Sequence, residues 1–236
     1  MPAQSTQPRL LHCLAAATLI ASLGLPTAPL AQVPVPAGTQ PLTAFTWGEI
    51  ALLPDWCIDS QAGIYGTPEG GAYMNKSPRA PHWVSLMGRD FWHMHHYCYA
   101  LRDLMRSKKA GLGPAKRQQL YERARNDLYY VINNCGPKMP LLPEVFLKLG
   151  EVLTLLGDPL GAESAYARSR ALKPDYWPAY TASIDSLLGR KMYAQALELA
   201  QAGVAAAPAS AELKARLAQV EKAMRATPSA AAASAR

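Results

Sequence analysis

The stretch FLKLGEVLTLLGDPLGAESAYARSRALKP, residues 146–174, and the stretch YTASIDSLLGRKMYAQALELAQAGVAAAP, residues 180–208, carry the same pattern. Each begins with an aromatic residue, has small residues inside and ends with a proline. The matching positions are Phe146, Leu149, Gly150, Leu153, Ala162, Tyr166 and Pro174 in the first stretch, and Tyr180, Leu187, Ala196 and Pro208 in the second. Small residues let two helices approach closely, and a proline stops a helix. The pattern therefore predicts two helix-turn-helix units. We call the interval from Phe146 to Tyr180 the repeat length.

This pattern resembles the tetratricopeptide repeat (TPR) family. Ser183, Ile184 and Ala200 depart from the family pattern in the second unit. The resemblance implies an all-α fold, namely a short TPR-type helical solenoid. Because the family is defined by its scaffold, it also implies protein-protein interaction without naming a partner. We find no complete catalytic constellation in the sequence, so we expect no enzymatic activity.

Helices are also expected on both sides of the two units. Pro140 lies one repeat length before Pro174, at the position of a closing proline. This predicts that residues 84–140 form a long helix pair that serves as a degenerate first repeat. Its first helix is expected over residues 84–108, because apolar residues recur there at steps of three and four. Its second helix is expected after Gly113, with Pro114 in the first turn. Residues 211–224 read as a capping helix.

The N-terminal residues have the features of a secretory signal. Arg9 precedes an apolar run over residues 10–25, and small residues follow at Ala28 and Ala31. The run is shorter than the roughly 20 residues that a membrane span needs. We therefore expect cleavage after Ala31, a periplasmic location, no transmembrane segment in the mature chain and no nucleic-acid partner.

These observations predict six segments. They are a signal peptide (1–31), a Pro-rich linker (32–45), an irregular, loop-rich N-terminal cap (46–83), the long helix pair (84–140), the TPR-like repeats with the capping helix (141–226) and a disordered tail (227–236).

Three cysteines remain after the predicted cleavage: Cys57, Cys98 and Cys135. If the helices on either side of Gly111 are antiparallel, Cys98 and Cys135 are offset by eleven residues, or roughly 16 Å, which exceeds the roughly 7 Å that a disulfide can bridge. One partner must then be Cys57, and we favour a Cys57–Cys98 bridge. The alternative is three buried free thiols.

The chain is basic, with 24 lysine and arginine residues against 17 acidic ones. Part of this excess is local, because eight basic residues cluster around one expected turn: Arg102, Arg106, Lys108, Lys109, Lys116, Arg117, Arg123 and Arg125. Such a cluster can bind an anionic polysaccharide, a lipid headgroup or an acidic protein face. It can also be a solvated pair of helix ends.

A histidine-rich run is the most chemically suggestive motif. On a helix, His93 and His96 share a face, His95 and Cys98 nearly share another, and His82 can approach from the loop. An alternative function is therefore metal or haem handling. The spacing matches no strong metal motif, and histidines packed among aromatic residues explain it equally well, so no cofactor is predicted.

The TPR resemblance implies a concave groove lined by the first helix of each repeat. The residues expected there are Leu147, Glu151, Thr154 and Leu155, followed by Thr181, Asp185 and Leu188. The positions at which some family members clamp a C-terminal carboxylate with Lys and Asn are apolar, hydroxylic or acidic here. We therefore expect a basic or amphipathic segment of another envelope protein as the partner. A further alternative is carbohydrate binding by tryptophans of the cap, which core packing explains equally well.

Overall fold

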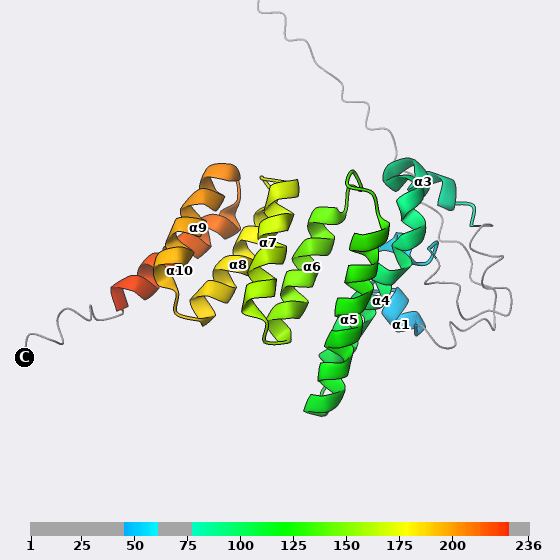
Figure 1. Ribbon diagram of the computed structural model, residues 1–236, viewed down its shortest axis with the longest axis horizontal. Helices are drawn as coiled ribbons and strands as arrows, with labels where there is room; N and C mark the ends of the chain where they lie inside the picture. The colour runs from blue at the N-terminus through cyan, green and yellow to red at the C-terminus, as the bar shows by residue number, and fades with distance from the viewer. Residues whose placement is uncertain (1–44, 61–76, 227–236) are drawn as a thin grey trace, which may run out of the picture. The chain divides into compact units, whose positions relative to one another are not determined.

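The computed structural model describes residues 45–60 and 77–226, so the predicted signal, most of the linker and the predicted tail lie outside the described residues. The described residues form helices and no strand (Figure 1). This confirms the predicted all-α class. Within these residues no helix combines the length and the apolar character needed to cross a membrane.

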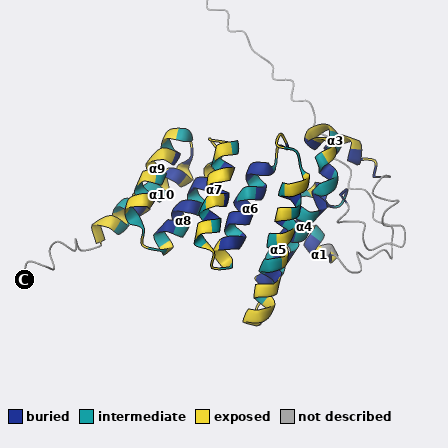
Figure 2. Ribbon diagram, viewed as in Figure 1, coloured by how far each residue is buried: buried dark blue, intermediate teal, exposed yellow. Residues whose placement is uncertain are grey.

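Seven longer helices follow one another from the second half of the histidine run to the end of the described chain. They are α4 (His95–Ser107), α5 (Pro114–Asn134), α6 (Leu142–Leu155), α7 (Pro159–Leu172), α8 (Trp177–Gly189), α9 (Tyr193–Ala206) and α10 (Ala211–Ala226). Each packs against the next, and α8 also contacts both α6 and α10 (Figure 1). Figure 2 shows that buried residues lie where neighbouring helices meet.

The part before α4 is built from short pieces. These are α1 (Trp47–Ile50), the 3-10 helix η1 (Asp55–Cys57), α3 (Ala80–Met87) and the 3-10 helix η3 (Gly88–His93). The prediction of one continuous helix over residues 84–108 is wrong, because the chain changes helix at Gly88. Gly88 has φ +66°, a left-handed conformation that favours glycine and ends α3. Phe91 and Met94 are nevertheless fully buried, so the apolar periodicity identified core residues across the break.

The small residues of the repeats lie where helices approach closely. A Cβ atom at Gly150 on α6 would overlap the ring of Tyr166 on α7. Ala162 on α7 and Ala196 on α9 are fully buried. Close packing of α6 on α7 therefore depends on glycine at position 150.

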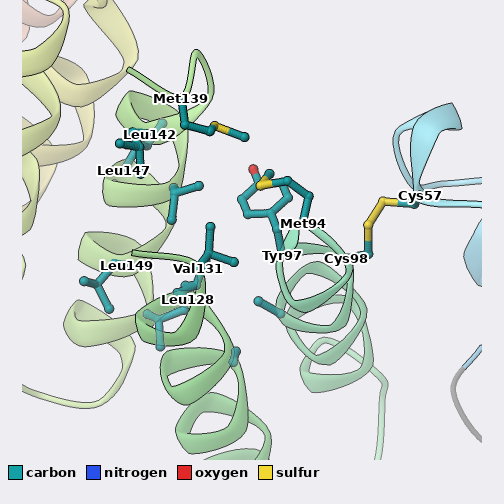
Figure 3. Close-up of a cluster of buried hydrophobic side chains, with 14 of the residues drawn as sticks. Cys57, Met94, Tyr97, Cys98, Leu128, Val131, Met139, Leu142, Leu147 and Leu149 are labelled. Atoms are coloured by element: carbon teal, nitrogen blue, oxygen red, sulfur yellow. A yellow bond between two sulfur atoms is a disulfide. The ribbon is translucent and has the colours of Figure 1, made fainter. Parts of the chain in front are cut away.

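One apolar cluster joins the first part of the chain to α6 and α7. In Figure 3, Met94, the residue before α4, and Tyr97 of α4 lie near Val131 of α5 and the side chains of the following loop and α6. The Tyr97 hydroxyl donates to a carboxylate oxygen of Glu144 on α6. Burial raises the pKa of Tyr97 well above its usual value, so the phenol stays protonated and can donate this bond.

A disulfide joins Cys57 to Cys98, which is the pairing that the sequence favours (Figure 3). Both sulfur-bearing residues are buried, and the Ser60 hydroxyl lies 3.8 Å from the Cys98 sulfur. The bridge fixes the short helix η1 against α4 across a sequence separation of 41 residues. Cys135 is free, and burial raises the pKa of its thiol to about 12.

Replacing both Cys57 and Cys98 with alanine is expected to lower the free energy of unfolding by about 3 kcal/mol, because the bridge restricts a long loop in the unfolded chain. Urea unfolding monitored by circular dichroism measures this loss. Cys135→Ser is the matched control and should change stability by less than about 1 kcal/mol, since Cys135 is only half-buried. Equal losses in the two proteins would contradict the role assigned to the bridge.

Candidate interaction groove

A hollow of about 760 Å³ lies between the ends of α6 and α8 and the turn that follows each helix. Its lining comes mainly from these two helices and from the start and middle of α7. The lining residues are Glu151, Thr154, Leu155, Gly157, Pro159, Tyr166, Ala182, Asp185, Ser186, Gly189 and Arg190. We call this hollow the α6–α8 groove. Its volume lies within the range of roughly 300–1,000 Å³ that is typical of ligand sites.

Two half-exposed carboxylates line the groove. Glu151 lies 2.9 Å from the ammonium of Lys148, and Asp185 forms an ion pair with Arg216 of α10, with its Oδ2 atom 3.0 Å from an Arg216 nitrogen. Both pairs are partly open to solvent, so each contributes little to stability. The two carboxylates therefore remain available to a cation that enters the groove.

The third charged lining residue is Arg190, which is held by an acid outside the groove. Its guanidinium lies 3.3 Å from a carboxylate oxygen of Glu163 on α7, and Glu163 also accepts a hydrogen bond from Ser183. Arg190 is thus paired with Glu163, whereas Glu151 and Asp185 are paired with Lys148 and Arg216 and not with Arg190.

The backbone adds to this electrostatic character. The groove lies at the C-terminal ends of α6 and α8, where the helix dipoles place partial negative charge. Two carboxylates and two helix C-termini together favour a positively charged or hydrogen-bond-donating ligand group.

The floor of the groove carries a hydroxyl pair. The Tyr166 hydroxyl lies 3.2 Å from the hydroxyl of Thr154, which also donates to the Gly150 carbonyl oxygen. Burial raises the pKa of Tyr166 to about 12, so its phenol is neutral at physiological pH. Leu155 lies at the rim with 49% of its surface exposed and supplies apolar contact.

Four of the seven residues predicted for the groove line it: Glu151, Thr154, Leu155 and Asp185. Leu147 does not, because it is 5% exposed and packs in the cluster shown in Figure 3. Thr181 and Leu188 lie on α8 outside the lining, and the Thr181 hydroxyl donates to the Pro178 carbonyl. Leu147 therefore lies in the core and outside the α6–α8 groove.

Sequence reasoning missed most of the other lining residues. Tyr166 was recognised at a repeat position but not as a groove residue, although it lines the groove. Arg190 follows α8 directly, and a basic residue beside the C-terminus of a helix is a signal that could have drawn attention to it.

The four predicted metal-ligand histidines do not form one site. His82 lies on α3 beside the ring of Trp83, whereas His93 lies on η3, and His95 and His96 begin α4. Across residues 45–60 and 77–226, no group of three or more His, Cys, Asp or Glu side chains is arranged to hold a metal ion. Although a break separates η3 from α4, His93 and His96 both lie against Tyr130 of α5.

Each histidine of the run has a protein partner instead. His93 contacts the Tyr130 hydroxyl at 3.4 Å, His95 contacts the Trp92 carbonyl at 2.7 Å, and His96 pairs with Asp127 of α5. The His96 ring also stacks near the Tyr130 ring, with centroids 3.6 Å apart. Burial lowers the pKa of His95 to about 4, so His95 is neutral at physiological pH. These contacts tie the start of α4 to α5.

The cap tryptophans proposed for carbohydrate stacking are mainly core residues. Trp56 and Trp83 are 8% and 7% exposed, and the Trp83 indole donates to Asp59 at 2.7 Å. Trp92 is half-buried and packs beside Phe91. Neither Trp56 nor Trp83 presents a free ring face to a sugar.

A scan of the chain against protein-family models finds no match, and a search among curated proteins finds no relative. The function of this all-helical protein is therefore inferred from its own residues.

Proposed function

We propose that the chain is an exported TPR-type adaptor or assembly factor of the cell envelope that binds a basic or amphipathic segment of another envelope protein in the α6–α8 groove. It acts by holding a partner and has no catalytic activity. The observation that carries this proposal is the groove itself, which combines apolar surface, two carboxylates and two helix C-termini.

The spacing of the helices supports the TPR-type assignment. α7 begins at Pro159 and α9 at Tyr193, while α8 begins at Trp177 and α10 at Ala211. Both intervals equal the repeat length of the sequence pattern. The contacts of α8 with α6 and α10 are those expected when the first helices of successive repeats stack side by side.

Two features support the proposed location outside the cytoplasm. The signal-like pattern over residues 1–31 predicts export, and a buried disulfide is typical of proteins from oxidising compartments. A groove between repeats fits a protein that acts by holding a partner.

The proposal is tested by site-specific crosslinking in the envelope. A photoreactive amino acid at Leu155, on the groove rim, should give a discrete crosslinked partner, whereas the same group at the exposed Ala171 of α7 should not. Mass spectrometry then identifies the partner and the crosslinked peptide. A peptide without basic residues, or equal products at both positions, would contradict the proposal.

Charge reversal in the groove supplies the quantitative prediction. Glu151→Lys with Asp185→Lys should weaken binding of the identified partner at least about tenfold, because two cations then face the cationic ligand. Glu198→Lys with Glu221→Lys is the matched control, since both acids lie outside the groove and the net charge changes equally. Isothermal titration calorimetry measures both affinities, and an equal loss in the control would show that bulk charge, rather than the groove, governs binding.

A further inference from the structure

The hairpin formed by α4 and α5 ends in a basic turn. Residues 104–121 contain five basic residues and no acidic one. The first of these, Arg106, is neutralised by Glu49 of α1, with both nitrogen–oxygen distances at 2.7 Å. Four cations remain at the end of the hairpin, and we call them the basic tip: Lys108, Lys109, Lys116 and Arg117.

The cations of the basic tip form no ion pair with any described residue. The Arg117 guanidinium donates to the Ser107 and Leu112 carbonyl oxygens, so it closes the turn while keeping its full positive charge. The three lysines are exposed. By contrast, Arg79 is paired with Asp59, and Arg123 is paired with Asp103.

The basic tip also projects from the helices beside it. α5 has 21 residues and its neighbour α6 has 14, and a short loop joins the end of α5 to the start of α6. The extra residues of α5 therefore extend its other end by about 10 Å at about 1.5 Å per residue. Figure 1 shows this end reaching beyond the end of α6.

We propose that the basic tip is a docking surface for anionic lipid headgroups at a membrane surface. A projecting convex end can meet a flat charged plane with all its cations at once, whereas a peptide ligand is typically held in a groove. Leu112, half-buried between the lysines, adds apolar character at the same end. This surface would hold the protein against a membrane independently of what the α6–α8 groove binds.

The attraction is electrostatic, so its size follows from the number of charges. Each lysine or arginine near an anionic membrane strengthens binding by about fivefold at moderate ionic strength. Removing the three lysine charges should therefore reduce vesicle binding by about 100-fold, and raising the salt concentration should also reduce it, since the Debye length falls to roughly 3 Å at 1 M.

Flotation of the purified protein with lipid vesicles tests this proposal. The probes are vesicles of phosphatidylcholine alone and vesicles in which about a third of the lipid is phosphatidylglycerol. The test variant is Lys108→Gln/Lys109→Gln/Lys116→Gln, and the matched control is Lys138→Gln/Lys214→Gln/Lys222→Gln, which removes the same charge from other exposed lysines. Circular dichroism verifies that both variants keep their helix content.

The proposal predicts salt-sensitive binding to the phosphatidylglycerol vesicles that the control variant keeps and the test variant loses. It is overturned if the two variants lose binding equally, if the test variant binds as the unmodified protein does, or if the unmodified protein does not prefer anionic vesicles. It is also overturned if the unmodified protein is retained by dextran sulfate at salt concentrations at which it no longer binds the vesicles, which would identify a soluble polyanion as the better ligand.

Discussion

Replacing Asp59 with asparagine is expected to lower the free energy of unfolding by about 3 kcal/mol, because the buried Arg79 guanidinium then keeps only the exposed Asp55 carboxylate, 3.7 Å away, as a counter-charge. The Asp59 side chain is 2% exposed, and its Oδ2 atom lies 2.6 Å from a nitrogen of Arg79, whose side chain is 9% exposed. The same carboxylate accepts hydrogen bonds from the Ser77 hydroxyl at 2.8 Å and the Trp83 indole at 2.7 Å. An asparagine would place an NH₂ group at one of the two oxygen positions, where it cannot accept a hydrogen bond from these donors.

Urea unfolding with the disulfide intact measures this loss. Asp175→Asn is the matched control, because Asp175 pairs with Lys173 at 3.6 Å and both side chains are at least half exposed. Its removal should cost less than about 1 kcal/mol. Replacing Asp59 and Arg79 together with leucine and methionine should destabilise less than Asp59→Asn alone, since no charge is then left buried. A loss below about 1 kcal/mol for Asp59→Asn would show that water reaches the Arg79 guanidinium.

The Asp59 cluster and the disulfide explain how an irregular cap holds one structure. In the sequence, Asp59 and Ser60 precede residues 61–76, and Ser77, Arg79 and Trp83 follow them. The cluster joins Asp59 to Ser77, Arg79 and Trp83, while the disulfide of Cys57 ties η1 to α4. Polar contacts of this kind leave no periodic trace in a sequence, so the sequence predicted an irregular cap with a covalent tie but not the buried carboxylate at its centre.

The longer helices were predictable because apolar periodicity reports burial directly. Leu128 and Val131 of α5 are both fully buried, as the pattern around Pro114 to Cys135 indicates. The helix boundary at Gly88 was missed because the apolar periodicity continues across it. Phe91 and Met94 continue the apolar spacing through η3, so burial persists although the helix changes, and only the positive φ of Gly88 marks the end of α3.

The groove was predicted only in part, because its lining depends on how two helix ends meet. Glu151 and Asp185 occupy equivalent positions, one repeat length apart, and both reach the groove. Leu147 lies one turn earlier on α6, where neighbouring side chains cover it. The repeat period predicts which face of a helix a residue lies on. How far the residue is buried on that face depends on how the adjacent helices pack.

Exchanging the large and the small residue between α6 and α7 should reveal whether the pair α6–α7 and the pair α8–α9 pack in equivalent ways. Gly150 and Tyr166 meet in the first pair, and the positions one repeat length later are Ile184 and Ala200, both fully buried in one cluster. The large residue is thus on the second helix of the first pair and on the first helix of the second pair. We infer that the departures at Ile184 and Ala200 from the repeat pattern are one compensated change in volume.

We therefore expect Gly150→Ile alone to cost about 3 kcal/mol through overpacking, and Tyr166→Ala alone to cost about 4 kcal/mol through the cavity it leaves. The double variant rebuilds the arrangement of Ile184 and Ala200, so its cost should fall below the sum of the single costs by at least about 2 kcal/mol. Urea unfolding of the four proteins gives the coupling energy. Gly189→Ala is the control for adding a side chain, because no atom lies within 4 Å of the position of its Cβ. Costs that add to within about 0.5 kcal/mol would mean that the two positions do not compensate, and that the repeat relation between α6–α7 and α8–α9 does not extend to their packing.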